Sequence, residues 1–335
     1  MKACFMTDRK DDVIGYIFGG GRREHFEAEL DVMEGVYSSR DLDIYKSEFA
    51  HVDVILSSWG MPELTDEQIE VYFPNLKLIL YGAASVQYFA RPFMRRGVRI
   101  TTAASIMADY VAQFTFAQIL QANKGYYHAM TMYRADGHDK GNQFATRRCP
   151  GTFGTKVGII GAGAIGSRVI QLLRQLDCEI LVFDPFLPPE KARDMGVTLV
   201  SLETLFAECQ TISNHLANNA QTVGMLNYDL FQRMKPDAAF INTGRGAQVV
   251  EADLARALEE EPLRCALLDV TDPEPCPSDH VFWRLPNVFM TPHIAGLGAR
   301  EVWGFADLLL EELHRYQAGE PLQHEVRTEM LKTLA

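Results

Sequence analysis

A glycine-rich stretch in the middle of the chain constrains the fold more than any other feature. It runs from Lys156 to Gly166 and reads KVGIIGAGAIG. Its apolar run, Val157 to Ile160, is typical of a strand buried on both faces of a sheet. The following segment, SRVIQLLRQLDC, places apolar residues at helical spacing. This region is therefore predicted to form a strand, a glycine turn and a helix.

Gly161, Gly163 and Gly166 fit the pattern G-x-G-x-x-G. In a dinucleotide site the first glycine makes a tight turn, the second lets the backbone approach a pyrophosphate, and the third lets the helix pack closely on its strand. The pyrophosphate lies at the helix N-terminus, where free N–H groups and the helix dipole favour an anion. The pattern predicts such a site, and the alternative is an ordinary tight turn.

Asp184 supports the dinucleotide interpretation. It ends the next predicted strand, Glu179 to Phe183, and follows Gly166 by 184 − 166 = 18 residues, close to the roughly 20 expected. A carboxylate at this place accepts hydrogen bonds from both adenosine ribose hydroxyls and repels a 2′-phosphate. We therefore expect NAD rather than NADP, the alternative being a plain loop aspartate.

Composition limits the class of protein. A chain of 335 residues predicts about two domains, and its net charge of −12 argues against nucleic acid as a partner. The six cysteines are scattered without a C-x-x-C pair, which indicates reduced thiols in the cytoplasm and no zinc site. The N-terminus becomes charged too early for a signal peptide, and no apolar run is long enough to cross a membrane.

The first hundred residues are predicted to form a small α/β unit. Gly19 to Gly21 lack a clear βαβ context and are interpreted as a flexible turn. The expected strands are Lys2 to Thr7, Val52 to Ser57 and Leu76 to Leu80. A helix from Thr65 to Tyr72 is expected between the last two of them.

A helix is expected from Ser105 to Tyr133, and residues 134–150 are interpreted as a polar, solvated loop without metal-ligand spacing. Strands and helices then alternate up to Pro292, which predicts a parallel sheet wrapped by helices. A last helix is expected from Arg300 to Ala318. It lies beyond the alternating strands and helices, so it can return to the first domain and pack there. The strands expected after Asp184 are Val197 to Val200, Thr211 to Leu216, Ala238 to Asn242, Cys265 to Val270 and Val288 to Met290.

Three chemically useful side chains follow successive predicted strands. Arg245, Glu274 and His293 come shortly after the strands that end at Asn242, Val270 and Met290. Because ligands bind at the carboxyl ends of parallel strands, we expect this trio beside the glycine turn. Taken singly, each has a plain alternative: a strand-end ion pair, a solvated acid and a structural histidine.

Together the trio suits the reduction of a 2-keto acid. An arginine fork binds the carboxylate and polarises the adjacent carbonyl. The nicotinamide supplies hydride, and His293 supplies a proton near working pH. Glu274 would orient the imidazole and favour its charged form. Asp269 is a separate candidate for holding the nicotinamide, and His215 is either a cofactor contact or a core histidine.

The segments KVGIIGAGAIG, NTGRG, LDVTDPEP and TPHIAG occur in this order, and with them the chain resembles the D-isomer-specific 2-hydroxyacid dehydrogenase family over nearly its whole length. The resemblance implies an α/β fold with a Rossmann-type doubly wound parallel sheet and a second, smaller flavodoxin-like α/β domain. It places a discontinuous substrate domain at residues 1–102 and 297–335 and the NAD-binding domain at 103–296. It also implies a homodimer paired through the nucleotide domains.

The resemblance carries the family's roles over to this chain. Arg245, Glu274 and His293 fall on the catalytic positions, and Asp269 falls on the nicotinamide contact. The residues implied in cofactor binding are Gly161, Gly163, Ala164, Ile165, Gly166, Asp184, His215, Thr243, Gly244, Arg245, Asp269, His293, Ala295 and Gly296. The residues implied in substrate binding are Ala83, Ala84, Ser85 and Arg245.

Three segments depart from the family's pattern. The loop GAASVQ lacks the usual aspartate, Gln113 replaces the glutamate of V-A-E, and Ala217 replaces the proline of H-L-P. None removes a catalytic residue, but the first two bear on substrate identity. Glu274 argues against the formate dehydrogenase branch, which has glutamine there.

The expected function is hydride transfer between NAD(H) and a small 2-keto or 2-hydroxy acid, with glyoxylate or hydroxypyruvate as the first candidates. Neither nucleic acid nor a membrane is expected as a partner. The alternative is an NADH-sensing binding protein that resembles the C-terminal-binding corepressors, which keep the same trio. Tight NADH binding without turnover would distinguish that alternative from an enzyme.

Overall fold

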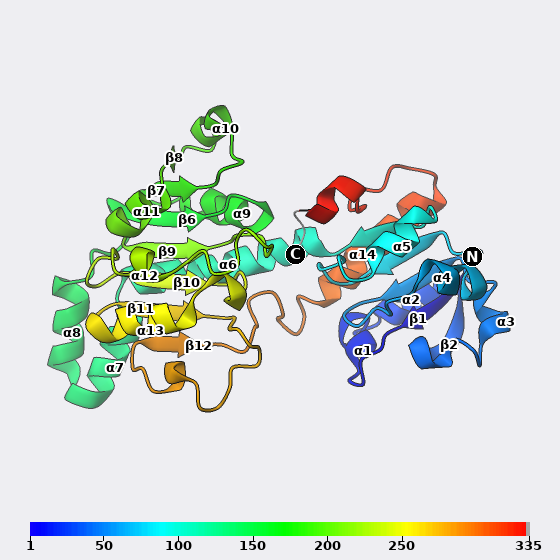
Figure 1. The fold of residues 1–335 in the computed structure, drawn as a ribbon, viewed down its shortest axis with the longest axis horizontal. Coiled ribbons are helices and arrows are strands. Elements are labelled where there is room, and N and C mark those ends of the chain that lie inside the picture. Colours follow the sequence, from blue (N-terminus) through cyan, green and yellow to red (C-terminus); the bar gives the residue numbers. More distant parts are fainter. Residues whose placement is uncertain (333–335) are drawn as a thin grey trace. The chain divides into compact units, whose positions relative to one another are not determined.

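Two separate parallel sheets divide the chain into two units. The structure is a computed structural model and describes residues 1–332. Unit 1 comprises residues 1–107 and the segment from Leu297 onward, and unit 2 comprises Ala108–Gly296. Helix α6 (Ala104–Asn123) begins in unit 1 and runs into unit 2 (Figure 1).

Unit 1 contains a five-stranded sheet in the order β2-β1-β3-β4-β5, with every neighbouring pair parallel. This is the strand order of flavodoxin-like folds, so the predicted class of the smaller domain is confirmed. The strands are β1 (Lys2–Met6), β2 (Asp31–Tyr37), β3 (Val54–Ser57), β4 (Leu78–Tyr81) and β5 (Arg99–Thr102). The sequence did not predict β2, an edge strand with charged and glycine residues in its middle.

The last long helix, α14 (Trp303–Gln317), lies in unit 1, where it packs against α1 (Val13–Ile17), α2 (Arg22–Glu29) and β4. A buried cluster that includes Phe49, Ile55, Ile79 and Phe93 forms the core on the face of α3, α4 and α5. The helices of unit 1 are α1 (Val13–Ile17), α2 (Arg22–Glu29), α3 (Lys46–Phe49), α4 (Asp66–Tyr72), α5 (Ala90–Arg95) and α14 (Trp303–Gln317), with 3₁₀ helices η1 (Ser39–Asp41) and η4 (Thr328–Lys332).

Gly19 to Gly21, interpreted from sequence as a flexible turn, is a packed turn. Gly20 has φ +61°, and a Cβ atom there would lie 3.1 Å from two indole carbons of Trp303. The guanidinium of Arg22 lies over the same indole at 5.1 Å from its centroid. The contact joins residues almost 300 positions apart, so local sequence carries no sign of it.

Unit 2 contains a seven-stranded sheet in the order β12-β11-β10-β9-β6-β7-β8, and all its pairs are parallel (Figure 1). The order reverses between β6 and β9, as in Rossmann folds, and this confirms the predicted doubly wound sheet. The strands are β6 (Thr155–Ile160), β7 (Cys178–Phe183), β8 (Thr198–Leu199), β9 (Thr211–Asn214), β10 (Ala239–Asn242), β11 (Cys265–Leu268) and β12 (Val288–Met290).

Successive strand residues of unit 2 point into two different cores, as the two-residue period of a strand requires. Phe240 joins the cluster under α11, α12 and α13, whereas Ile241 joins the cluster under α6 and α9. The remaining helices are α9 (Ala164–Leu173), α10 (Pro189–Asp194), α11 (Leu202–Glu208), α12 (Tyr228–Phe231) and α13 (Glu251–Glu260), with 3₁₀ helices η2 (Gly246–Gln248) and η3 (Val281–Trp283).

Residues 134–150 are not the loop that the sequence predicted. The expected helix from Ser105 onward ends at Asn123, and Gly125, with φ +65°, begins a helical hairpin. Its helices are α7 (Tyr126–Asp136) and α8 (His138–Arg147), separated by Gly137. The polar composition is that of a solvated helix pair, since Phe144 and Gly141 are the buried residues of α8.

Candidate active site

The glycine turn after β6 has the geometry of a close backbone approach. Gly161 has φ +87°, and a Cβ atom there would lie 2.8 Å from the carbonyl oxygen of His215. A Cβ atom on Gly166 would lie 2.0 Å from the carbonyl oxygen of Gly161. A Cβ atom on Gly163 would meet no atom within 4 Å. The first and third glycines are therefore required by the fold, and the second faces open space.

The N-terminus of α9 begins at this open space. Its N-cap is Gly163, which supplies no side-chain hydrogen bond to the free N–H groups of the first turn. Ala164 and Ile165 are the first residues of the helix. Uncapped N–H groups beside a glycine with free space fit the pyrophosphate of a dinucleotide.

Asp184 connects the end of β7 to the glycine turn. Its Oδ2 accepts a hydrogen bond of 2.8 Å from the N–H of Ala162, and its Oδ1 accepts one of 2.8 Å from the N–H of Phe186. These contacts fix the carboxylate at the edge of the turn. A carboxylate has about four lone-pair sites, so acceptor capacity remains for ribose hydroxyls.

His215 lies at the carboxyl end of β9, against the same turn. Its Nε2 lies 2.9 Å from the Ser213 hydroxyl, and its backbone N–H donates to Ile160. Burial lowers the pKa of His215 to about 3, so the ring is neutral. Its buried Nδ1 has no partner among the described residues. With one ring nitrogen unpartnered, His215 is not a fully satisfied core histidine.

Glu274 and His293 are joined directly. The Nδ1 atom of His293 and the Oε1 atom of Glu274 lie 2.6 Å apart, and both side chains are about two-fifths exposed. His293 has φ 54°, the one positive value among the described non-glycine residues. Such backbone strain persists where the surroundings enforce it, and it is concentrated at functional sites.

Asp269 holds the backbone turn that carries His293. Its Oδ1 accepts hydrogen bonds from the Thr291 hydroxyl at 2.6 Å and the Ile294 N–H at 2.8 Å. Its Oδ2 accepts one from the Ala295 N–H at 2.9 Å, and its carbonyl oxygen accepts the His293 N–H at 2.9 Å. This buried carboxylate therefore has a structural task that the sequence did not predict, besides the expected nicotinamide contact.

Arg245 follows β10 and places a positive charge at the carboxyl edge of the sheet of unit 2. Its Nη1 donates a 2.8 Å hydrogen bond to the Gly244 carbonyl. Burial lowers the pKa of its guanidinium, and the nearby charge of Glu274 opposes that shift. Within residues 1–332 it forms no ion pair. A partly buried cation without a paired carboxylate is a favourable place for an anion.

The substrate loop expected at Ala83, Ala84 and Ser85 lies in unit 1, just after β4, whereas the trio belongs to unit 2. Gly82 fixes the start of this loop by donating to Ser57 and accepting from the Ser58 hydroxyl at 2.8 Å. In the described part of the chain the N–H groups of Ala84 and Ser85 donate no hydrogen bond. They are available to an anionic ligand.

Sequence reasoning missed a set of buried amide side chains below Arg245. Gln248 accepts a hydrogen bond from the Arg245 N–H, and Asn242 donates one to the Arg245 carbonyl oxygen. Gln248 lies three residues after Arg245, the N-cap residue of η2, and its side chain reaches back to the N–H of that N-cap residue as the second residue of a capping box does. That spacing is the signal in the sequence that could have revealed Gln248.

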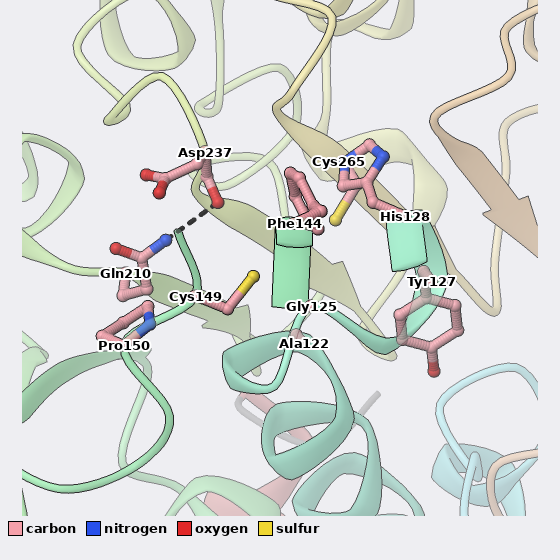
Figure 2. Close-up of a pocket in the computed structure, with 10 residues that line it drawn as sticks. All are labelled: Ala122, Gly125, Tyr127, His128, Phe144, Cys149, Pro150, Gln210, Asp237 and Cys265. Atoms are coloured by element: carbon pink, nitrogen blue, oxygen red, sulfur yellow. Dashed lines mark hydrogen bonds between the residues drawn. The ribbon is translucent and has the colours of Figure 1, made fainter. Parts of the chain in front are cut away.

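A small cavity of about 10 Å³ lies at the opposite edge of the same sheet (Figure 2). It is lined by residues at the amino ends of the strands, among them Gln210, Asp237 and Cys265, and by the hairpin residue His128. Gln210 Nε2 donates to the Asp237 carbonyl at 2.8 Å, as the dashed line shows. A space of this size admits no more than about one water molecule, so it is not the substrate site.

Residues 1–332 contain neither a membrane-spanning helix nor a cluster of metal ligands. No helix there is both long and apolar enough to cross a membrane. No group of three or more His, Cys, Asp or Glu side chains in that range is arranged to hold a metal ion.

Residues 116–295 match the family model described as the D-isomer specific 2-hydroxyacid dehydrogenase, NAD binding domain. The chain belongs to this family. As a D-2-hydroxyacid dehydrogenase it is an NAD-dependent oxidoreductase that acts on CH–OH groups, as the sequence predicted. The match spans the glycine turn, Asp184, Arg245, Glu274 and His293.

Curated relatives agree with this membership, and a solved structure shares the fold. The dehydrogenase is 26% identical to a glyoxylate reductase of Korarchaeum cryptofilum over 316 residues. This matched region covers 92% of each chain. It is 29% identical to a D-3-phosphoglycerate dehydrogenase of Archaeoglobus fulgidus over 75% of this chain and 47% of that one, so it spans about half the length of that relative. A solved 2-hydroxyacid dehydrogenase of Ketogulonicigenium vulgare, 24% identical, shares the fold with a TM-score of 0.74 and covers 97% of this chain and 98% of that one.

Proposed function

We propose that this dehydrogenase reduces a small 2-keto acid to the D-2-hydroxy acid, with Arg245, Glu274 and His293 acting on the substrate. The observation that carries the proposal is the 2.6 Å contact between Glu274 and His293, at the same sheet edge as a cation without an ion pair. A substrate with a carboxylate and an adjacent carbonyl suits this arrangement, because the cation would bind the carboxylate and the histidine would give a proton to the carbonyl oxygen.

Each residue of the trio has its own role in this proposal. Arg245 binds the substrate carboxylate and polarises the carbonyl oxygen, since its guanidinium presents donors in a fixed fork. Glu274 holds Nδ1 of His293 and thereby directs Nε2 toward the substrate. His293 holds a proton at Nε2 and donates it to the carbonyl oxygen as that oxygen becomes an alkoxide. Bound NADH supplies the hydride.

The cofactor would lie along the carboxyl edge of unit 2. The turn from Gly161 to Gly166 and the first residues of α9 would hold the pyrophosphate, and Asp184 the adenosine ribose. His215, Asp269 and the turns at Thr243–Arg245 and His293–Gly296 would contact the nicotinamide half.

We assign residues 1–102 and 297–335 to a substrate domain and 103–296 to the NAD-binding domain. In the substrate domain the unused N–H groups of Ala84 and Ser85 would bind the substrate carboxylate. Glyoxylate or hydroxypyruvate is the first candidate, supported by the name of the Korarchaeum cryptofilum relative.

We further propose that the enzyme is a cytoplasmic homodimer paired through its NAD-binding domains. The α7–α8 hairpin supports this pairing because it has exposed aromatic side chains, with Tyr126 48% and Tyr133 57% exposed. Sedimentation of the purified protein and of a Tyr133→Ser variant would test it. A monomer at micromolar concentration would contradict the proposal.

The experiment for the catalytic assignment compares Arg245→Ala with His293→Ala. Arg245→Ala is expected to raise KM for the keto acid and to lower kcat. His293→Ala is expected to lower mainly kcat, by roughly 10²–10⁴-fold. Near-normal turnover in both variants would contradict the assignment. NADH binding without turnover by the unmodified protein would favour an NADH-sensing protein instead.

A further inference from the structure

Asn214, Asn242 and Gln248 form one buried cluster of amides below the Arg245 turn. Asn214 and Asn242 are the last residues of β9 and β10, and Gln248 ends η2. Their side chains are at most 1% exposed. Their side-chain hydrogen bonds join them to one another and to backbone groups, and none of these bonds goes to a charged side-chain group. The cluster is therefore not part of an ion-pair network.

The amides bind one another first. Asn214 Nδ2 donates a hydrogen bond of 3.0 Å to Asn242 Oδ1 and a second, of 2.6 Å, to Gln248 Oε1. Buried amides that satisfy each other in this way are held in one orientation, because rotating any of them leaves a donor or an acceptor unpaired. The cluster is therefore a rigid support.

This support fixes the backbone of Arg245 on both sides. Gln248 Oε1 accepts the Arg245 N–H at 3.3 Å, and Asn242 Nδ2 donates to the Arg245 carbonyl oxygen at 3.1 Å. Asn242 Oδ1 also accepts the Gly244 N–H at 3.0 Å. The direction in which the guanidinium leaves the sheet edge is set by these three bonds.

The same support reaches the loop on the cofactor side. Gln248 Nε2 donates a hydrogen bond of 2.8 Å to the carbonyl oxygen of Leu216, and Asn214 Oδ1 accepts the Leu216 N–H at 3.2 Å. Leu216 follows His215, whose carbonyl oxygen lies against Gly161 of the glycine turn. Among the three amides, Gln248 alone bonds directly to both loops.

We propose that Gln248 is a positioning residue that sets the Arg245 turn relative to the His215–Leu216 loop, and so sets the substrate cation relative to the cofactor. The inference rests on the proposed role of Arg245. Gln248 is fully buried, so it would act through the two backbones that it holds and not by direct contact with a ligand. Its removal changes where Arg245 points without removing the guanidinium.

The test uses Gln248→Met, which keeps the length of the side chain and removes its hydrogen bonds. The control is Asn287→Leu. Asn287 is another buried amide of unit 2, 3% exposed, and its Nδ2 donates to the Leu258 and Arg264 carbonyls rather than to either loop. For each variant we would measure thermal stability, Kd for NADH, kcat, KM for the keto acid, and Kd for oxamate with NADH present.

Gln248→Met is expected to raise KM and the oxamate Kd and to lower kcat, each by between about tenfold and a hundredfold, as small misplacements of a binding group do. Asn287→Leu is expected to lower thermal stability and leave KM and the oxamate Kd within about twofold of the unmodified enzyme. Gln248→Met with KM, kcat and oxamate binding at the level of the control overturns the proposal.

Two further arms keep the result interpretable. If Gln248→Met does not fold, Gln248→Asn replaces it, because the shorter amide stays polar but cannot reach both loops. Arg245→Ala is measured in parallel. Retained turnover in Arg245→Ala contradicts the proposed function itself, whereas lost turnover there with unchanged Gln248 variants contradicts only the positioning role.

Discussion

The Oε1 atom of Glu274 lies 2.6 Å from the Nδ1 atom of His293, and this contact decides which nitrogen of the imidazole is free. With Nδ1 engaged by a carboxylate, Nε2 is the atom left to carry the proton in the proposed reaction. Both side chains are partly exposed, so in that proposal solvent would return the proton after each turnover.

Glu274→Gln keeps the shape of the side chain and removes its charge. The amide still accepts a hydrogen bond from Nδ1 but no longer places a negative charge beside the ring during proton transfer, so kcat is expected to fall by about tenfold to a hundredfold, less than for loss of the acid itself. Steady-state kinetics would check this. Asp279→Asn removes an exposed carboxylate from the same loop and should leave kcat unchanged. Equal effects of the two variants would show that only loop charge matters.

Asp184→Ala removes the carboxylate that we place at the adenosine ribose. Hydrogen bonds to a charged group contribute about 1.5–3 kcal/mol, so Kd for NADH should rise at least about tenfold. Kd for NADPH should rise less, since repulsion of its 2′-phosphate is also lost. Fluorescence titration with both cofactors measures the ratio. Glu190→Ala, at an exposed position in α10, controls for net charge. An unchanged preference for NADH would exclude Asp184 as its source.

His215 makes stability depend on pH. Burial lowers its pKa from 6.5 to about 3, so in this window the unfolded chain binds a proton that the folded chain does not. The contribution of His215 to stability is therefore complete above about pH 6.5 and decreases as the pH falls toward 3. Between pH 8 and pH 5 this single group should cost about 2 kcal/mol of unfolding free energy.

His215→Gln is expected to lose less stability than the unmodified protein over that pH range. Urea unfolding at pH 8 and at pH 5 would measure the difference. His25→Gln, at an exposed position of α2, should behave like the unmodified protein. Parallel pH profiles for all three proteins would show that His215 is protonated equally in the folded and unfolded states.

The packed turn before α2 offers a matched pair of glycines. Gly20 and Gly21 both have positive φ, but a Cβ atom on Gly20 would lie 3.1 Å from the Trp303 indole and one on Gly21 would meet nothing within 4 Å. Alanine at either position costs about 1–2 kcal/mol for the left-handed backbone. Gly20→Ala should therefore destabilise unit 1 more than Gly21→Ala, as thermal unfolding would measure. Equal losses would show that the indole moves aside freely.

Much of the fold follows from local sequence patterns. The strand from Thr155 to Ile160, its glycine turn and the helix after it are predicted by an apolar run, three glycines and helical spacing. The expectation that Glu274 and His293 lie close together agrees with their hydrogen bond, because parallel strands end at one edge. The catalytic roles of both residues stay predictions.

Other features depend on contacts that local patterns do not carry. The edge strand β2 has charged residues and a glycine because only its inner face packs, so it lacks the apolar run that indicates β3 or β4. The turn at Gly20 depends on Trp303, and the support below Arg245 depends on amides from three separate segments. Asp269 was expected to face the cofactor, but its bonds to the His293 turn become visible only in three dimensions.

The central claim is that the protein turns over 2-keto acids with NADH. The most direct test is the loss of NADH absorbance with purified protein and a panel of glyoxylate, hydroxypyruvate, pyruvate, a branched-chain keto acid and phenylpyruvate, with NADPH in parallel. We predict NADH oxidation with glyoxylate or hydroxypyruvate, a weaker response with NADPH, and loss of both in Arg245→Ala. Binding of NADH without oxidation by any acid of the panel would contradict the claim.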